Sequence, residues 1–347
     1  MKILHVADLH NVCLHRLLGE HIAFHRHWDV VIELDSIINK YKPDVITLGG
    51  DIYNSFNPGS WELLPFTYLL SCIKKLDIPI VMIPGNHDVE GIPGDLSTAF
   101  LIPLANMYNL HMVTRTTKIF SVKDATFIGW PPKSFPNKKY IKKILQCPRP
   151  RIGLMHVPFY GAWISMDKRR LRTGFKLEAA QKTVDIFELD YLLLGDVHEY
   201  QVLDKDSRII YPGSTLQTKF NESLEKGVIL VDTIKHKHKF ISIRSPAKLR
   251  TVVNVNNIND KDYFRLSLTD KKEAMAILAN LPQRVVKVVY DFKGELEEVN
   301  RPLKKIEWRI NLLDIIENCL SLSVKDPKQS LEYLTKILGS EDLLTLP

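Results

Sequence analysis

Residues 80–88 read IVMIPGNHD: four apolar residues end abruptly in a turn that carries three polar side chains. Two earlier stretches share this arrangement, since residues 2–10 (KILHVADLH) and 45–51 (VITLGGD) also run from a strand-like apolar segment into polar residues. Apolar residues at helical spacing over 28–41 and 62–76 predict helices between them. Alternating strands and helices indicate an α/β sheet, whose sites lie at the carboxyl ends of its strands.

From about residue 118 the pattern changes to shorter strands without intervening long helices. Residues 118–129 predict a hairpin, and strands over 152–156 and 191–194 end near His156 and the stretch GDVH (195–198). Further strands are expected at 208–211, 227–231 and 240–244. A second sheet packed on the first would give an α/β protein of the layered α/β/β/α sandwich type.

Pro246 marks a boundary after which the pattern changes again. Strands at 250–255, 263–268 and 285–292 with a helix at 270–281 predict a small α+β module. The charged stretch 293–298 is typical of a linker. Two amphipathic helices are expected in the tail, with one-sided apolar faces formed by Trp308, Leu312, Ile315 and Cys319 and by Leu331, Leu334, Ile337 and Leu338. These helices either close the module's core or bind a partner.

Composition excludes several classes of protein. The chain has 347 residues, 45% hydrophobic and 25% charged, which is ordinary for a folded chain of about two domains. No apolar run approaches the ~18 residues of a membrane helix, and the start of the chain does not resemble a secretory leader. Four scattered cysteines (Cys13, Cys72, Cys147 and Cys319) indicate neither a disulfide framework nor a zinc knuckle, and favour a reducing, cytoplasmic compartment.

Five strand ends carry residues that divalent metal ions prefer as ligands. A two-metal site needs one bridging carboxylate, and Asp51 is suited to bridge the two ions. Residues at i and i+2 beyond a strand point the same way, so Asp8 and His10 can converge, as can Asp196 and His198. The sequence predicts a two-metal site with these ligands: Asp8, His10, Asp51, Asn86, His156, Asp196 and His198.

The motifs DLH (8–10), GGD (49–51), GNHD (85–88), GLMH (153–156) and GDVHE (195–199) resemble those of the calcineurin-like metallophosphoesterases. The chain is most similar to their SbcD-like branch, the DNA-repair and recombination nuclease subunits that pair with an SMC-like, SbcC-type ATPase, phage members included. Residues 211–215 and 220–222 resemble the segment that closes the family's catalytic domain. The resemblance implies a metallophosphoesterase domain over 1–246, a DNA-capping module over 247–299 and an ATPase-binding helical segment over 300–347.

The same resemblance implies an activity. Two divalent ions, Mn²⁺ in preference to Mg²⁺, would hydrolyse DNA phosphodiesters as an exonuclease, with endonuclease activity as a further option. His87 would contact the scissile phosphate or protonate the leaving group, with Asp88 orienting its imidazole. A homodimer within the ATPase complex, and a nucleoid-associated place in a bacterial or phage-infected cell, would follow. No membrane association is expected.

The first motif is followed by Asn11-Val12-Cys13, where the family normally has a Gly-containing turn. Two single positions also depart from the family pattern. Asp196 stands where the last motif usually has His, and a carboxylate still binds Mn²⁺ or Mg²⁺. Asn54 stands three residues after the bridging Asp51, where the nuclease branch often has His. This second change puts a phosphate contact from position 54 in doubt without affecting the metal ligands.

The net charge of +7 is modest, but many of the basic residues are concentrated in two runs. Lys138, Lys139, Lys142 and Lys143 belong to the first, and Arg169 and Arg170 to the second. They are either solvated surface or contacts to a nucleic-acid backbone. Phe159, Tyr160 and Trp163, near the second run, are either core residues or platforms that stack on unpaired bases. The rival functions are a phosphatase or small-molecule phosphodiesterase of the same fold, and an inert scaffold that holds an ATPase on DNA.

Overall fold

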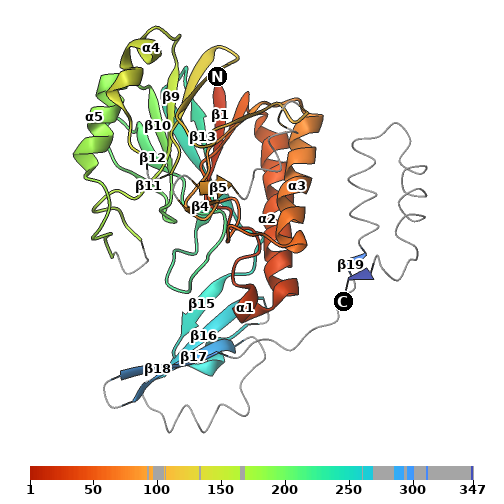
Figure 1. The fold of residues 1–347 in the computed structure, drawn as a ribbon. Coiled ribbons are helices and arrows are strands. Elements are labelled where there is room, and N and C mark those ends of the chain that lie inside the picture. The colour runs from red at the N-terminus through yellow and green to blue at the C-terminus, as the bar shows by residue number, and fades with distance from the viewer. Residues whose placement is uncertain are drawn as a thin grey trace, which may run out of the picture.

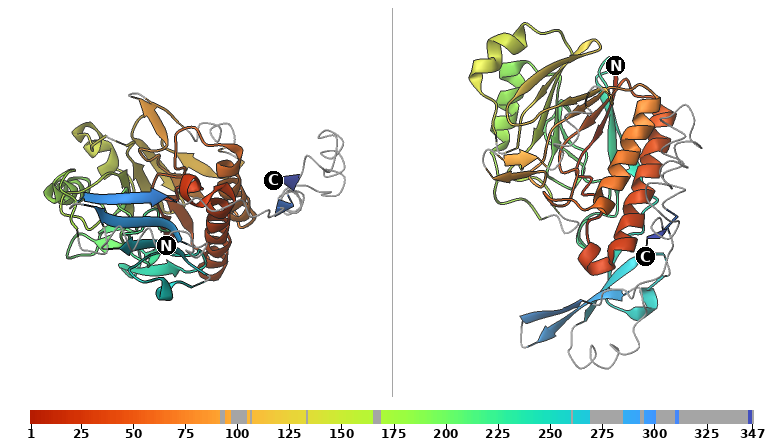
Figure 2. Two further views of the ribbon diagram at one scale, coloured as in Figure 1. Left: turned by 90° about the horizontal axis from the view of Figure 1, so that it is seen from below. Right: turned by 45° about the vertical axis from the view of Figure 1, so that its right-hand side comes forward.

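The computed structural model describes residues 1–91, 94–96, 105, 107–132, 134–164, 169–259, 261–268, 285–292, 295–300, 310–311 and 345–346. Two six-stranded sheets face each other and form the body of the molecule (Figure 1). A smaller four-stranded sheet lies at one end of this body, on the side away from the N-terminus (Figures 1 and 2).

The first sheet contains the strands that end in the early polar turns. Its order is β14–β13–β1–β2–β3–β6, and β1, β2, β3 and β6 run parallel. Its strands are β1 (Lys2–Val6), β2 (Val45–Leu48), β3 (Ile80–Met82), β6 (Leu110–Met112), β13 (Lys226–Asp232) and β14 (Lys237–Ile243). The parallel register brings the ends of β1, β2 and β3 to one edge.

The second sheet has the order β11–β12–β10–β9–β8–β7, with β8, β9, β10 and β12 parallel. Its strands are β7 (Lys118–Val122), β8 (Ala125–Gly129), β9 (Arg151–His156), β10 (Tyr191–Gly195), β11 (Gln201–Val202) and β12 (Ile209–Tyr211). The β7–β8 hairpin turns at residues 123–124, as predicted. His156 is paired with Gly195, so the ends of β9 and β10 also lie side by side.

Alternation along the strands sorts the side chains into layers. In β1, Ile3 packs between the two sheets while Leu4 faces the helices, and Val45 and Ile46 divide in the same way in β2. Helices α2 (Glu20–Tyr41) and α3 (Ser60–Lys75) cover the outer face of the first sheet, and α4 (Ile141–Leu145) and α5 (Leu177–Phe187) cover that of the second. The predicted α/β/β/α sandwich is confirmed.

A buried histidine joins the two sheets below the site. His5 is fully buried on the inner face of β1, with Nδ1 2.9 Å from the Thr47 hydroxyl and Nε2 3.0 Å from the Leu194 carbonyl. Burial lowers the pKa of His5 to about 4, so the ring is neutral and donates from Nε2. It thereby links β1, β2 and β10.

The small sheet consists of β15 (Leu249–Val252), β16 (Tyr263–Leu268), β17 (Val285–Phe292) and β18 (Glu295–Asn300). It packs against the short helix α1 (His15–Leu18) through a cluster that contains Leu18, Phe220, Leu249, Tyr263 and Val286. The remaining elements are β4 (Val89–Gly91), β5 (Gly94–Leu96), η2 (Lys138–Tyr140) and η3 (Val255–Asn257).

The structure corrects two predictions in the last fifty-five residues. The charged stretch 293–298 was expected to be a linker, but 295–300 forms β18, which pairs antiparallel with β17. A strand at the edge of a sheet tolerates charged side chains. Residues 310–311 form β19 (Ile310–Asn311), paired with β20 (Thr345–Leu346), where a helix was expected. The predicted helix at 270–281 and the rest of the tail helices lie outside the described residues.

Two further observations concern the chain as a whole. Cys13, Cys72 and Cys147 form no disulfide bond within the described part of the chain, and Cys319 lies outside it. None of the described helices combines the length and the apolar character that crossing a membrane requires.

Candidate metal centre

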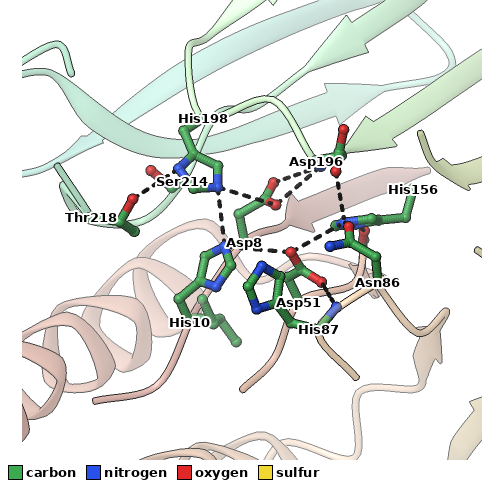
Figure 3. Close-up of polar contacts among 12 residues, drawn as sticks. Asp8, His10, Asp51, Asn86, His87, His156, Asp196, His198, Ser214 and Thr218 are labelled. Atoms are coloured by element: carbon green, nitrogen blue, oxygen red, sulfur yellow. Dashed lines mark hydrogen bonds and ion pairs between the residues drawn. The ribbon is translucent and has the colours of Figure 1, made fainter. Parts of the chain in front are cut away.

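The residues predicted as ligands leave their strands with an unusual backbone. Asp8, His10, Asp51 and Asp196 all have positive φ, between 46° and 91°. Residues other than glycine rarely adopt this left-handed region, and such positions cluster at functional sites. The turned backbone directs successive polar side chains toward one point, between the facing ends of the two sheets (Figure 3).

Asp51 occupies the middle of the centre. Its Oδ2 lies 3.5 Å from His10 Nε2 and 3.3 Å from His156 Nε2, so one oxygen lies between two imidazoles. Its Oδ1 accepts a hydrogen bond of 2.9 Å from the backbone N–H of His87. Gly85 packs directly on Asp51, and a Cβ at position 85 would collide with the carboxylate. Asp51 is therefore held where it can bridge two ions.

The first group of ligands surrounds His198. Its Nε2 lies 3.1 Å from His10 Nε2 and 3.9 Å from Asp8 Oδ1. Asp8 is fully buried at the end of β1, and both of its carboxylate oxygens accept from the backbone N–H of Asp196. Asp8, His10 and His198 thus each offer one ligand atom within 4.8 Å of the others.

The second group of ligands surrounds His156. Its Nε2 lies 3.1 Å from Asn86 Oδ1 and 3.7 Å from Asp196 Oδ1, besides its contact with Asp51. Asp196, where the family motif usually has His, points its carboxylate at this imidazole (Figure 3). The structure therefore brings all seven predicted ligands together.

Buried like charges give the centre its electrostatic character. Burial raises the pKa of Asp8 to about 7, although His156 and His198 oppose the shift. Burial alone would also raise the pKa of Asp51, but His156, His10 and His87 together hold it below its usual range. Burial disfavours a charged His156, yet the carboxylates of Asp51, Asp8 and Asp196 keep its pKa well above the usual value. Three carboxylates this close favour positive charge at the centre, which a protonated imidazole or a bound cation can supply.

The donor set fits divalent metal ions. Three triads of closely spaced ligand atoms can each hold an ion, and two of them share Asp51: Asp8–His10–His198, His10–Asp51–His87 and Asp8–Asp51–His156. Carboxylate oxygens mixed with imidazole nitrogens suit Mn²⁺ as well as zinc or iron. His10 Nε2 faces the centre, 3.1 Å from His198 Nε2. The buried Nδ1 of His10 has no hydrogen-bond partner in the described part of the chain.

Residues that the sequence analysis did not assign support His198. Its Nδ1 lies 3.0 Å from Glu222 Oε1 and 3.1 Å from the Thr218 hydroxyl. Glu222 pairs with Lys226 at 2.9 Å, and both side chains are almost fully buried. Lys226 also donates to the His198 carbonyl at 2.7 Å. A hydrogen bond that the outer ring N–H donates to a carboxylate is the usual way to orient an imidazole ligand.

His87 and Asp88 occupy different environments. His87 is exposed, its ring lies 5.0 Å from that of His10, and its Nδ1 donates to the Asn54 carbonyl at 2.8 Å. Asp88 is buried, and its carboxylate accepts from the backbone N–H groups of Gly85, Ile52 and Tyr53. Asp88 was expected to orient the imidazole, but a backbone carbonyl does so, and Asp88 instead ties together the turns that carry Asp51 and Asn86.

The two basic runs lie at opposite ends of the strands of the second sheet. Lys138, Lys139, Lys142 and Lys143 are exposed on η2 and α4, and the end of α4 is bonded to Arg151 at the start of β9. That start is about 17 Å along the strand from His156. Arg169 and Arg170 are exposed beyond the end of β9, on the metal-centre side. Figure 1 shows α4 at the far end of the sandwich from the small sheet.

Comparisons with known proteins agree with this centre. The family model of calcineurin-like phosphoesterases matches residues 1–200. An uncharacterized protein of Acanthamoeba polyphaga mimivirus is 23% identical over 300 residues, which is 81% of this chain but only 20% of the viral protein, so the chain spans about a fifth of that relative.

Solved structures were also matched. A Thermus thermophilus structure shares 14% identity, covering 70% of this chain and 99% of its own, with a TM-score of 0.41. A candidate 5′-nucleotidase from Staphylococcus aureus, in complex with α-ketoglutarate, shares 15% identity, covering 70% and 52%, with a TM-score of 0.36. The family match spans more than half of the chain and contains every predicted metal ligand, so this protein belongs to the calcineurin-like phosphoesterases.

Proposed function

We propose that this protein is a two-metal DNA nuclease that hydrolyses phosphodiester bonds and works with an SMC-like ATPase in DNA repair, recombination or replication. The observation that carries the proposal is the exposed His87 beside seven ligands that are buried or half-buried, with arginines on the loop that leaves His156. A polyanionic substrate suits such surroundings, because phosphate contacts by Arg and Lys dominate nucleic-acid affinity.

The residues divide the chemistry between them. Bound divalent ions would polarise the phosphate and lower the pKa of a water molecule toward neutrality. Asp51, positioned between both groups of ligands, would serve both ions. The Asn54 carbonyl fixes a proton on Nδ1 of His87, so a further proton on Nε2 would be available to the leaving sugar oxygen.

A substrate panel tests the reaction. The Mn²⁺-loaded protein should release nucleotides from linear DNA and hydrolyse bis-p-nitrophenyl phosphate, whereas a phosphomonoester should react at least about 100-fold more slowly, a difference of ~2.7 kcal/mol in activation free energy. Efficient turnover of mononucleotides with no release from DNA would favour a phosphatase instead. Inactivity on every ester, with normal DNA binding, would favour a scaffold.

His87 distinguishes catalysis from metal binding. Its ring belongs to one of the triads that can hold an ion, so a ligand role competes with the proposed acid role. His87→Gln should abolish hydrolysis while calorimetry still detects two Mn²⁺ ions. His236→Gln, in an exposed turn, is the matched control. Loss of an ion from the His87 variant would assign this residue to the ligands.

The two basic runs can be compared by charge reversal. Arg169→Glu with Arg170→Glu should weaken duplex binding and flatten its salt dependence by ~0.9 per lost phosphate contact. Lys142→Glu with Lys143→Glu makes the same change in charge at the opposite end of the strands. Equal losses in both variants would mean that the duplex follows the whole length of the second sheet, and no loss in either would mean that both runs are solvated surface.

The ATPase partnership rests on the resemblance of the SbcD-like branch. We propose that residues 300–347 bind the ATPase and that 247–299 cap the DNA. A chain ending after Asn300, which keeps β18, should still hydrolyse bis-p-nitrophenyl phosphate but lose ATP-stimulated digestion of duplex DNA. If the shortened chain melts much lower with no partner present, the tail belongs to the module's core.

A further inference from the structure

The segment that leaves His156 combines exposed aromatic residues with arginines. We name residues 157–164 and 169–176 the arginine loop. Three of the eleven exposed large apolar side chains among the described residues lie in it: Tyr160 at 60% exposure, Ile164 at 38% and Phe175 at 37%. Exposed apolar surface that is gathered in one place marks interaction sites more often than single exposed side chains do.

The arginine loop is rigidly held. Tyr160 N–H donates to the Phe175 carbonyl at 2.8 Å, and Leu171 N–H donates to the Ala162 carbonyl at 2.8 Å, so backbone hydrogen bonds join its two arms. Phe159 and Ala162 are buried in the core of the second sheet. These contacts settle one alternative from the sequence: Phe159 is a core residue, whereas Tyr160 is not.

Hydrogen bonds also attach the loop beside the metal centre. The backbone N–H and carbonyl of Trp163 bond to the side chain of Gln201 at 2.9 and 3.0 Å. Gln201 is buried and follows His198 by three residues. At the start of the same arm, the Tyr211 hydroxyl donates to the Val157 carbonyl at 2.6 Å, next to His156. The loop is therefore fixed to the chain that carries both imidazole ligands.

The outer surface of the loop is cationic and planar. The Arg170 guanidinium lies over the Trp163 ring, 4.2 Å from its centroid, and both groups are planar. Arg170, Arg172 and Lys176 are exposed, and none forms an ion pair with a carboxylate in the described part of the chain. A ligand with a flat face and a negative charge would complement this surface.

Resting on the proposed nuclease function, we propose that the arginine loop binds an unpaired nucleobase and its phosphate, so that single-stranded DNA is the form the centre receives. A base would stack on Tyr160 or on the outer face of the Arg170–Trp163 pair, and the neighbouring cations would contact the backbone. Stacking of this kind does not depend on base sequence, because every base has a flat π-face.

The experiment compares an oligothymidylate with an abasic oligonucleotide of equal length and charge. Binding of the full-length protein is followed by fluorescence anisotropy without added metal. Wild-type protein should prefer the oligothymidylate by roughly 5- to 150-fold, the range expected for one stacked base. Tyr160→Ala and Arg170→Gln should each reduce this preference. Their melting temperatures are measured in parallel.

A matched pair of residues provides the control. Lys139 lies over the Tyr140 ring at 4.9 Å, at the opposite end of the strands. Tyr140→Ala and Lys139→Gln should change the affinity for both oligonucleotides alike and keep the preference. A preference that survives in both loop variants would overturn the inference. If the wild-type protein cleaves DNA but does not prefer the oligothymidylate, the inference about the arginine loop is wrong and the nuclease proposal stands. If the protein neither binds nor cleaves DNA, both proposals are wrong.

Discussion

His156 and His198 face the same centre but are held in different ways. The His156 side chain is fully buried, and its Nδ1 donates to the Gly49 carbonyl at 2.7 Å. His198 is 18% exposed and is held by Glu222 and Thr218, whose loop follows β12. One imidazole is thus fixed by the backbone of the opposite sheet, and the other by side chains.

The difference has consequences for what each position can do. A backbone carbonyl carries no net charge and is positioned by the packing of the two sheets, so the hydrogen bond at His156 Nδ1 depends on that packing. Glu222 carries a charge that Lys226 and His198 stabilise: burial would raise its pKa, but these groups together hold it well below the usual range. The carboxylate also raises the pKa of His198 against the opposing effect of burial. A single substitution can therefore remove the group that orients His198, whereas the carbonyl that orients His156 cannot be removed in this way.

The His198 side is also connected to the small sheet. Gln217 donates to the carbonyls of Glu222 and Leu249, both at 3.1 Å, and accepts from the Leu249 N–H at 2.8 Å. Arg26, buried in α2, adds hydrogen bonds to the carbonyls of Gln217 and Ala247. The loop that orients one metal ligand therefore also holds the first strand of the module.

Asp51→Asn should have the largest effect, because it removes the charge common to both sides. Loss of several kcal/mol of transition-state stabilisation corresponds to a rate decrease of at least about 1,000-fold. Calorimetry should show weakened binding of both Mn²⁺ ions. If one ion still binds with wild-type affinity, the two halves are independent, and Asp51 does not bridge them.

Glu222→Gln should separate the two halves. Loss of the carboxylate that orients His198 should weaken Mn²⁺ binding at one site and leave the other site unchanged. Removing the carboxylate partner of a metal-bound histidine typically reduces metal affinity about 10- to 100-fold. Glu225→Gln, an exposed residue of the same loop, is the control. Equal weakening of both sites would contradict the division between His156 and His198.

The number of protons released when Mn²⁺ binds should also distinguish the His156 side from the His198 side. Metal ions bind neutral imidazole, while the raised pKa values of His156 and His198 favour the protonated rings in the metal-free protein. Mn²⁺ affinity should therefore fall as the pH decreases below these values, by about tenfold per unit for each displaced proton. Calorimetry in two buffers of different ionisation enthalpy counts the protons. Glu222→Gln should reduce the count, because the His198 pKa falls, and an unchanged count would show that His156 alone binds the proton.

Thr218→Val should have the smallest effect. The Thr218 hydroxyl donates to Glu222 at 2.6 Å, and a hydrogen bond to a charged group contributes about 1.5–3 kcal/mol. Only part of this contribution should reach the metal site, because the Thr218 N–H and Lys226 still hold the carboxylate in the variant. Mn²⁺ affinity at the His198 side should decrease by less than about tenfold. A loss as large as that of Glu222→Gln would mean that the hydroxyl, rather than the carboxylate, orients the ring.

The metal ligands could be predicted because each one belongs to a local sequence pattern, an apolar strand followed by a polar residue. Apolar strands that end in Asp, His or Asn reveal both the sheet edge and the metal donors. Glu222 and Lys226 could not be assigned in this way, since their contact with His198 depends on the tertiary fold, and no local pattern reveals a buried lysine. Their only signal was the similarity of 220–222 to the family's closing segment.

Two other differences have a common physical origin. Asp88 follows His87 in sequence, but consecutive residues of a turn point to different sides, so the carboxylate faces the buried backbone and the imidazole faces solvent. The lysines at 138–143 precede His156 by fewer than twenty residues, yet a whole strand separates them from it. Nearness in sequence was a poor guide to position in both cases.

The left-handed backbone at the ligands also has an energetic meaning. Residues in this region cost about 1–3 kcal/mol each, so four of them together represent a large part of an ordinary domain's net stability of about 5–15 kcal/mol. Metal binding would repay this cost, because ions bound only to the folded state stabilise it. Asp196→Gly, at φ 91°, would relieve part of the strain and should give a metal-free protein that melts higher while binding Mn²⁺ more weakly. In this protein, the geometry that makes a good metal ligand is the same geometry that makes the unliganded fold less stable.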